Sequence, residues 1–249
     1  MDMKIVVIGG TGLIGSKVVA LLNELGHQAV PASRSTGVNT LTGEGMNEIL
    51  RGAGVVVDVS NSPSFADDDV MNFFRTSTGN LLNAAAEAGV GHYVALSVVG
   101  CDRIPESGYM RAKAAQEELI KGSSLPYSLV HATQFFEFAG GIADSATTDG
   151  KVRLSDAKVQ PLAAEEVAAA VGTTAAGAPM NGTVEVAGPE VLGMDQWIGE
   201  VLTARSDPRE VITDPQAPYF GAVLERDSLL PGSGAQLAQI RLSEWLAGQ

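Results

Sequence analysis

The chain has 249 residues, of which 45% are hydrophobic and 18% charged, enough for one large domain with a real core. The formal net charge of −13 argues against nucleic-acid binding, because an acidic protein repels phosphate backbones. The single cysteine, Cys101, excludes an internal disulfide, and the three histidines lack the spacing of a metal site, so we expect no metal.

Short β-branched runs alternate with longer segments of helical period in the first half of the chain. This pattern predicts strands at residues 4–8, 28–33, 54–60, 92–97 and 127–132, and helices at residues 13–25, 67–88 and 108–121. Pro31 weakens the second of these strands. Strands that alternate with helices predict a doubly wound parallel sheet, which is a Rossmann-type α/β fold with helices on both faces.

The pattern becomes less regular after Gln134. Strands are expected at residues 152–154 and 183–188, and helices at residues 163–176, 194–204 and 235–248. We divide the chain into a Rossmann core over residues 1–133 and a smaller portion over residues 134–249. The second portion is predicted to complete the sheet and to form a small substrate-binding lobe within one compact domain.

A glycine-rich loop follows the first strand directly and opens the first helix. Gly9 permits a tight turn, Gly12 lets a pyrophosphate approach the backbone, and Gly15 lets the helix pack on the strand. Unpaired N–H groups at the start of the helix attract phosphates. We therefore predict a dinucleotide site whose loop contacts come from Gly9, Thr11, Gly12, Leu13, Ile14 and Gly15.

The second predicted strand ends in Ser33, Arg34 and Ser35, where a site that prefers NAD usually has an acidic residue. A guanidinium beside two hydroxyls suits a ribose 2′-phosphate, since it offers charge and several donors. We predict NADP(H) as the cofactor, with NAD(H) less favoured. Residues 1–133 then form an NADP-binding core. The alternative is a solvated Arg34 in a surface loop.

Polar residues also follow the other predicted strands, at the carboxyl ends where ligands bind in such sheets. Further cofactor contacts are expected from Ser60, Asn61, Ser62, Lys113 and Thr133. Substrate contacts are expected from Gln134, Phe135 and Phe136, although these phenylalanines can instead pack the C-terminal portion onto the sheet.

Ser97 closes a predicted strand, and Tyr109 and Lys113 lie one turn apart near the start of the helix at residues 108–121. Reduction of a carbonyl needs a proton for the developing alkoxide, and a neighbouring ammonium lowers the pKa of a tyrosine that supplies it. Helical periodicity places Lys113 at the edge of the buried face, with Glu117 toward solvent and Leu119 toward the core. The three residues form a candidate catalytic set.

The chain resembles the atypical short-chain dehydrogenase/reductase family, in its NmrA-like NAD(P)H-binding branch. The resemblance rests on GGTGLIG, on Ser97 in ALSVVG, on YMRAK and on the segments at residues 130–138, 159–171 and 184–190. It implies that Tyr109 is the acid/base, Lys113 its partner and Ser97 the orienting hydroxyl.

These observations predict an NADP(H)-dependent oxidoreductase that acts on a small carbonyl, enone or quinone-like substrate. A second hypothesis is a non-enzymatic NADP(H)-sensing regulator, since the resemblance includes such proteins. A third is an enzyme like the nucleotide-sugar epimerases, against which the short C-terminal portion argues. No run of about 18 apolar residues occurs, so we expect no membrane span and a cytoplasmic location. The oligomeric state stays open.

Overall fold

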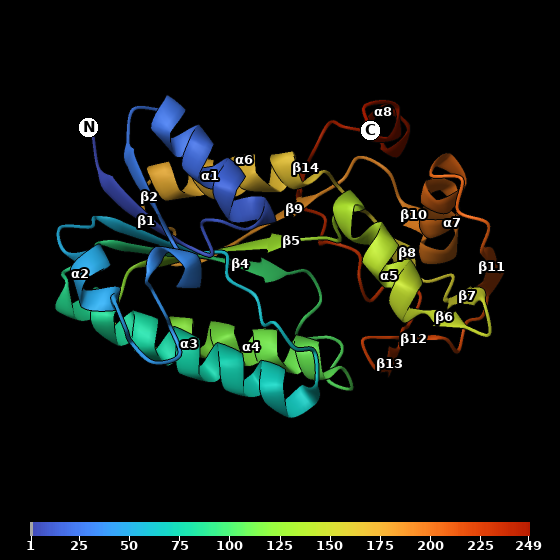
Figure 1. The fold of residues 1–249 in the computed structure, drawn as a ribbon, viewed down its shortest axis with the longest axis horizontal. Helices are drawn as coiled ribbons and strands as arrows, with labels where there is room; N and C mark the ends of the chain where they lie inside the picture. The colour runs from blue at the N-terminus through green and yellow to red at the C-terminus, as the bar shows by residue number, and fades with distance from the viewer. Residues whose placement is uncertain (1) are drawn as a thin grey trace.

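A parallel sheet of seven strands lies at the centre of the computed structural model, which describes residues 2–249 (Figure 1). Every neighbouring pair of strands in this sheet is parallel, as the sequence predicts. The strands in spatial order are β14 (Gln236–Leu237), β9 (Gly182–Ala187), β5 (Tyr127–Ala132), β4 (His92–Val98), β3 (Val55–Asp58), β1 (Lys4–Ile8) and β2 (Gln28–Ala32).

Helices cover both faces of the sheet. On one face lie α1 (Leu13–Glu24) and α6 (Ala164–Ala176), and on the other lie α2 (Met46–Leu50), α3 (Asp67–Glu87) and α4 (Gly108–Lys121) (Figure 1). The central strands are rich in buried Val, Ile, Leu and Ala, which contact helices on both sides. Pro31 is tolerated because β2 is an edge strand, where the missing N–H group breaks no ladder bond.

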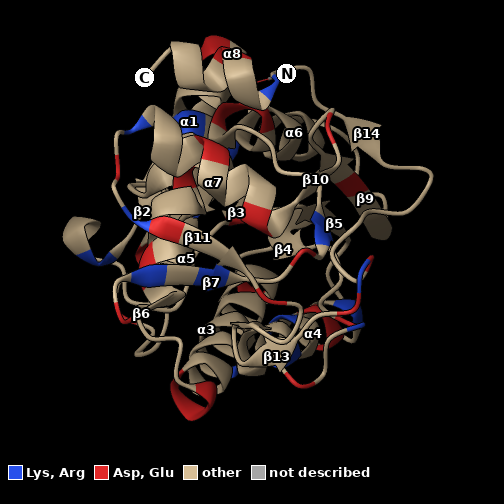
Figure 2. Ribbon diagram, turned by 90° about the vertical axis from the view of Figure 1, so that its right-hand side faces the viewer, with Lys and Arg blue, Asp and Glu red and all other residues tan. Residues whose placement is uncertain are grey.

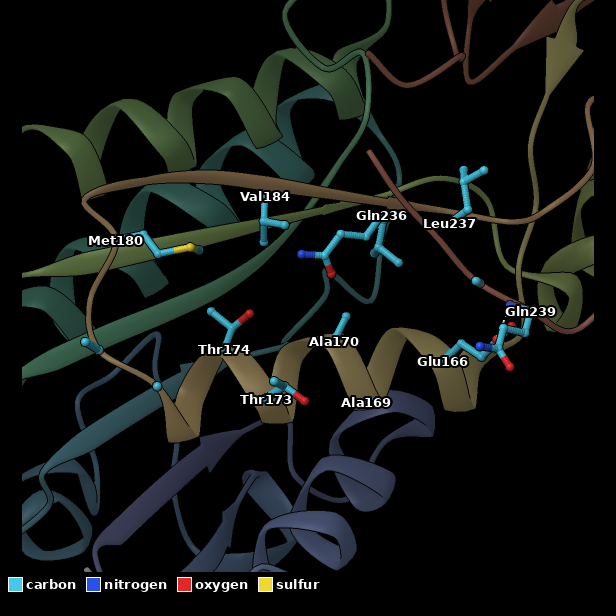
Figure 3. A pocket seen from close by; sticks show the side chains of 14 residues that line it. Glu166, Ala169, Ala170, Thr173, Thr174, Met180, Val184, Gln236, Leu237 and Gln239 are labelled. Atoms are coloured by element: carbon cyan, nitrogen blue, oxygen red, sulfur yellow. Dashed lines mark hydrogen bonds between the residues drawn. The ribbon is translucent and has the colours of Figure 1, made fainter. Parts of the chain in front are cut away.

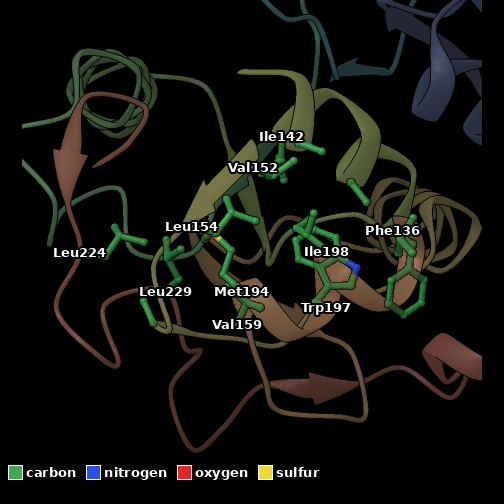
Figure 4. Packing of buried hydrophobic residues seen from close by; sticks show 14 of the residues in the cluster. Phe136, Ile142, Val152, Leu154, Val159, Met194, Trp197, Ile198, Leu224 and Leu229 are labelled. Atoms are coloured by element: carbon green, nitrogen blue, oxygen red, sulfur yellow. The ribbon is translucent and has the colours of Figure 1, made fainter. Parts of the chain in front are cut away.

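The C-terminal portion extends the sheet through β9 and β14 and then forms a smaller unit beside it. This unit has its own apolar cluster around Trp197 and Ile198 (Figure 4). Its elements are the 3₁₀ turn η2 (Phe136–Phe138), the helices α5 (Ala139–Ser145), α7 (Met194–Ala204) and α8 (Leu242–Ala247), and the strands β6 (Thr147–Thr148), β7 (Lys151–Leu154), β8 (Lys158–Val159), β10 (Leu192–Gly193), β11 (Glu210–Thr213), β12 (Pro218–Tyr219) and β13 (Ala222–Val223).

Two predictions about elements were wrong in detail. The helix expected at residues 235–248 begins only at Leu242, because Gln236 and Leu237 pair with β9 as an edge strand. In α4, Leu119 is exposed and Glu117 is buried, the reverse of the expected faces. Within residues 2–249, none of the helices is both long and apolar enough to cross a membrane.

Candidate active site

The loop between β1 and α1 has the geometry that its glycines predict. Gly9 has a φ of 77°, which favours glycine, and a Cβ at Gly15 would overlap the carbonyl oxygen of Gly9. Gly10, which the sequence analysis did not single out, is also required, since its Cβ would lie 2.6 Å from the Val7 carbonyl oxygen. A Cβ at Gly12 would meet only the Gly9 oxygen, at 3.3 Å, so the rest of that position is open to a ligand.

Helix α1 starts directly at this loop, with Gly12 as its N-cap residue. No side chain caps the first turn within the described part of the chain, so its N–H groups are available to an anion. The predicted contacts Thr11 and Leu13 are both exposed there. These features fit the pyrophosphate of a dinucleotide.

The turn after β2 presents Arg34 to solvent. Its backbone is held by Ser33, whose N–H donates to Thr36 Oγ1 at 2.8 Å, and the Ser33 and Ser35 hydroxyl oxygens lie 2.8 Å apart. Arg34 is exposed, and its guanidinium makes no hydrogen bond or ion pair within residues 2–249. A free guanidinium beside two hydroxyls is suited to a phosphate group.

The loop after β3 connects the glycine loop to Tyr109. A Cβ at Gly9 would lie 3.0 Å from Ser60 Cα, so the two loops are in contact. Ser60 is fixed by its hydroxyl, which donates to Asp58 Oδ1 at 2.6 Å. Further along the same loop, Phe65 contacts Tyr109, with ring centroids 5.6 Å apart, and the Asn61 side chain is close enough to the Tyr109 hydroxyl to lower its pKa. One continuous edge of the sheet therefore leads from the glycine loop to the candidate acid/base.

Tyr109 lies in the first turn of α4 and is surrounded by aromatic rings. Its ring centroid is 5.3 Å from that of Phe220, 5.6 Å from that of Phe65 and 6.2 Å from that of Phe74. Burial raises the pKa of Tyr109 to about 12, and the nearby Asn61 only partly offsets this. Without a bound ligand, the phenol is therefore a protonated donor.

Lys113 is more deeply buried than the sequence indicated, with 3% of its surface exposed. Its ammonium donates to the Leu96 carbonyl oxygen at 2.9 Å and to Gln116 Oε1, and it lies 4.4 Å from the centroid of the Phe74 ring. Burial lowers the pKa of Lys113 to about 8, although the buried Asp58 carboxylate favours the charged form. Phe74 thus contacts both Tyr109 and Lys113.

Ser97 is held by Glu117, which the sequence analysis placed toward solvent. The Ser97 hydroxyl donates to Glu117 Oε1 at 2.5 Å, His131 Nε2 lies 2.8 Å from the same oxygen, and Lys121 Nζ donates to Oε2 at 2.9 Å. Among the described residues, no hydrogen bond joins Ser97, Tyr109 and Lys113 to one another. The predicted catalytic trio therefore lies at one end of the sheet without being directly linked.

The carboxylate of Glu117 is the centre of this cluster. Burial alone would raise its pKa, but the hydrogen bonds and charge of His131, Ser97 and Lys121 outweigh burial and hold the pKa well below its ordinary range. Burial and the Glu117 charge raise the pKa of the Cys101 thiol, which donates to Glu117 at 3.1 Å, to about 12. Glu117 is therefore ionised and Cys101 is a thiol.

Cys101, Glu117 and His131 also bear on the prediction that the chain holds no metal. Their potential ligand atoms lie within 4.8 Å of one another. The Glu117 oxygen already interacts with the other two, which explains the grouping without an ion. The absence of a metal stays a prediction.

The predicted substrate residues differ in their surroundings. Gln134 is buried, and both polar atoms of its side chain lack a hydrogen bond within the described chain. Phe135 is half-buried and stacks on the exposed Phe138, with centroids 5.1 Å apart. Phe136 is only 1% exposed and lies in the C-terminal cluster (Figure 4). Its ring centroid is 5.3 Å from that of Trp245, which fits the packing role that the sequence analysis left open as an alternative.

Two of the predicted cofactor contacts, Thr133 and Ser62, already make hydrogen bonds within the protein. The Thr133 hydroxyl donates to the Gln160 carbonyl oxygen at 2.5 Å, and the Ser62 hydroxyl accepts from the Ser64 N–H group. Both residues are buried, whereas Asn61, the neighbour of Ser62, is exposed. Of these three residues, Asn61 is therefore the one that a ligand can reach, and its Oδ1 already accepts from the Ser62 N–H group at 3.0 Å.

Sequence reasoning missed the residues that hold the trio in place. Asp58 is fully buried and accepts from Ser60, from Tyr93 and from Gln116. Its position at the end of an apolar strand was the available signal. Gln116, three residues after Lys113, was detectable from its position on the same helical face as Lys113, whereas helical periodicity gave no signal for Glu117.

A groove of about 520 Å³ lies elsewhere, between α6, β9 and the edge strand β14. Figure 3 shows Ala170 and Thr174 of α6 facing Val184 and Gln236 across it. None of the predicted site residues lines this groove, so we place the candidate site at the carboxyl ends of the strands instead.

Figure 2 shows short basic segments interspersed with acidic ones along the ribbon.

Comparison with known proteins agrees with the geometry of the glycine loop and sheet. Residues 9–173 match the family described as NAD(P)H-binding. The chain belongs to this family. A solved structure of the enzyme WbmH from Bordetella bronchiseptica in complex with NAD⁺ superposes with a TM-score of 0.71 at 16% identity, and covers 98% of this chain and 96% of that one. The Rossmann-type fold and its likeness to the short-chain dehydrogenase/reductases are thereby confirmed.

Two curated relatives match only in part. The chloroplastic divinyl chlorophyllide a 8-vinyl-reductase of Cucumis sativus is 30% identical over an alignment of 203 residues, which covers 67% of this chain and 48% of the relative. The photosystem II assembly factor Ycf39 of Synechocystis sp. is 23% identical over an alignment of 149 residues, which covers 54% of this chain and 46% of the relative. The chain spans about half the length of these curated relatives.

Proposed function

We propose that this protein is an NADP(H)-dependent oxidoreductase of the NmrA-like branch, acting on a small carbonyl, enone or quinone-like substrate. The observation that carries the proposal is the continuous edge from the glycine loop through Ser60 and Asn61 to Tyr109. A dinucleotide whose phosphates lie at α1 would extend along this edge, and its nicotinamide would end beside a buried phenol.

When bound, the reduced nicotinamide supplies the hydride that the substrate carbon accepts. The chain supplies the proton: Tyr109 gives its phenolic proton to the substrate oxygen as negative charge develops there. Lys113 stabilises the resulting phenolate, and its pKa of about 8 keeps it charged in neutral solution. Asn61 is positioned to hold the substrate oxygen, while Ser97 can do so only by leaving Glu117.

The test of catalysis is NADPH consumption across a panel of carbonyls, enones and quinones. We expect turnover by the parent, and a loss of at least about 100-fold in kcat for Tyr109→Phe, because general acid catalysis typically contributes that much. Tyr127→Phe, at the opposite end of β5, is a matched control that removes a phenol hydroxyl away from the candidate site and should leave turnover unchanged. Equal turnover by the parent and Tyr109→Phe would overturn the acid/base role.

We propose a preference for NADP(H) over NAD(H), because Ser33, Arg34 and Ser35 can bind the 2′-phosphate. We expect NADPH to bind more tightly than NADH, and Arg34→Ala to remove most of that difference, since a charge-assisted bond to phosphate contributes about 1.5–3 kcal/mol. Arg51→Ala, on the loop before β3, is a control that should leave the ratio unchanged. Equal affinity of the parent for both cofactors, measured by calorimetry, would remove Arg34 from the site.

A non-enzymatic NADP(H)-sensing regulator is the second candidate. It is favoured by the engagement of Ser97 with Glu117, which leaves the orienting hydroxyl occupied, and by the partial match to an assembly factor. If the parent turns over no compound of the panel while NADPH changes the binding of a protein partner, this candidate replaces the first.

A further inference from the structure

The aromatic rings over Tyr109 form an unusual cover for a candidate active site. Phe220 stacks on the Tyr109 ring with an interplanar angle of 25°, and Phe65 lies 5.4 Å from Phe220, measured between ring centroids. Phe65 is 49% exposed and Phe220 is 38% exposed. Two large apolar side chains thus lie partly in solvent at the entrance to a phenol that needs access to substrate.

Phe220 is held over Tyr109 by a strained turn. It occupies the tip between β12 and β13 with a φ of 45°, and Gly221 follows with a φ of 83°. Two successive positive φ values define a turn whose first position favours Asn, Asp or Gly. An aromatic residue there costs backbone energy, and such strain concentrates at ligand-binding sites.

The hairpin that carries Phe220 packs against the C-terminal cluster through Tyr219 and Ala222, and its tip projects away from that cluster. Ala222 and Leu224 are buried in the C-terminal cluster, whereas Phe220 and Val223 are exposed. Each strand of the hairpin has two residues, and a hairpin this short has little stability of its own. The ring of Phe220 can therefore leave Tyr109 without disrupting the sheet that forms the cofactor site.

We propose that Phe65 and Tyr109 form a stacking site for a flat, conjugated ring of the substrate, and that Phe220 fills this site when no substrate is bound. This inference rests on the proposed function, because it assigns the ring to the substrate that Tyr109 protonates. A flat ring replaces the stacking lost when Phe220 leaves, whereas a saturated ring or a short aliphatic ketone does not.

Polar side chains of the protein lie at the edge of this stacking site. The Asn61 amide lies at the Tyr109 hydroxyl, and Gln134 offers a buried amide without a hydrogen bond within residues 2–249. Tyr219, which precedes Phe220, contacts the Phe220 ring edge-on at 4.7 Å and approaches Gln134. A carbonyl on the ring can thus reach Tyr109 and Asn61 while the opposite edge of the ring faces the hairpin.

The test measures equilibrium binding of methyl naphthyl ketone and methyl cyclohexyl ketone in the presence of NADP⁺, which cannot donate a hydride. In Phe220→Asn the competing ring is absent and asparagine accepts the positive φ. We expect the naphthyl ketone to bind about 3- to 10-fold more tightly than to the parent, as removal of one aromatic pair implies. The cyclohexyl ketone should change by less than about 2-fold, since its saturated ring gains no stacking partner.

Two further variants separate stacking from general loosening of the hairpin. Val223→Ala alters an exposed residue of the same hairpin and should leave both affinities unchanged, while Phe65→Leu should weaken the naphthyl ketone several-fold. If Phe220→Asn does not fold, Phe220→Leu removes the ring, keeps apolar contact and should act in the same direction. Unchanged or weaker naphthyl binding in the folded variant, or an equal gain for the cyclohexyl ketone, would overturn the inference. Because no turnover is needed, an inactive protein can still pass or fail this test.

Discussion

At the scale of single residues, Glu117 is the main departure from what the sequence suggests. It lies between an exposed Glu118 and a buried Gln116, and nothing in its residue type distinguishes it from its acidic neighbour. What distinguishes it is the set of polar groups around it: the Ser97 hydroxyl and the Lys121 ammonium donate to it, and His131 Nε2 lies 2.8 Å from it. Ser97 and His131 come from strands rather than from α4. Those contacts depend on tertiary structure, which helical periodicity alone cannot reveal.

Glu117→Gln should destabilise the protein by about 1–3 kcal/mol at pH 7, because it weakens several charge-assisted hydrogen bonds in a buried place. Glu118→Gln, on the exposed side of the same helix, should change stability by less than about 0.5 kcal/mol. Both are measured by urea unfolding. Equal effects for the two variants would show that the buried cluster does not stabilise the fold.

The contribution of Glu117 to stability should depend on pH, which a comparison of the parent with Glu117→Gln can test. The pKa of Glu117 is lowered on folding from its ordinary value of 4.5, so its stabilisation is fully present above that pH and is lost as the pH falls below it. The stability difference between the parent and Glu117→Gln should therefore shrink between pH 5 and pH 3. A difference that stays constant over this range would contradict an ionised, hydrogen-bonded Glu117.

Other residues were predictable because local chemistry determines them. Gly9, Gly12 and Gly15 are dictated by the strand–turn–helix motif, and the structure gives each the role that its spacing implied. Tyr109 and Lys113 were found from a spacing of one helical turn, but the burial of Lys113 was underestimated. Phe220 was missed, since it comes from a turn-rich segment far along the chain and only the fold brings it to Tyr109.

At the scale of elements, the glycine loop allows structure and ligand binding to be tested separately. Gly15→Ala should lower the thermal midpoint by several degrees, because its Cβ would overlap the Gly9 backbone and displace α1. Gly12→Ala should leave the midpoint nearly unchanged, since its Cβ meets only one atom at 3.3 Å, but should weaken NADPH binding at least about 10-fold by occupying the space of the pyrophosphate.

The two alanine variants are each other's control. If Gly12→Ala binds NADPH as well as the parent does, and only Gly15→Ala loses binding, the phosphates lie somewhere other than at the start of α1. Thermal unfolding and calorimetric titration of the same preparations give both quantities.

Strong elements were predicted within one or two residues of their ends, and weak ones were not. Helix α4 and strand β5 match the expected ranges at both ends, and Ser107 caps the start of α4. The expected helix at residues 235–248 has helical composition throughout, yet its first part pairs with β9. The edge of β9 offers backbone hydrogen bonds to an extended segment there, which competes with helix formation. Sequence periodicity cannot reveal this competition.

At the scale of the whole molecule, the C-terminal portion does more than follow the Rossmann core. Strands β9 and β14 complete the sheet, α6 covers one face beside α1, and the β12–β13 hairpin reaches Tyr109. The sequence predicted that residues beyond 134 would complete the sheet and contact substrate. The boundary between residues 133 and 134 stays a prediction, and the matched family region at residues 9–173 extends across it.

The most direct test of the account is a crystal structure with NADP⁺ bound. We predict the pyrophosphate at the N-terminus of α1, the 2′-phosphate within hydrogen-bond distance of Arg34, and the nicotinamide beside Tyr109 and Asn61. A nicotinamide placed away from Tyr109, or a dinucleotide bound in the groove between α6 and β14, would contradict the proposal that this edge of the sheet performs hydride transfer.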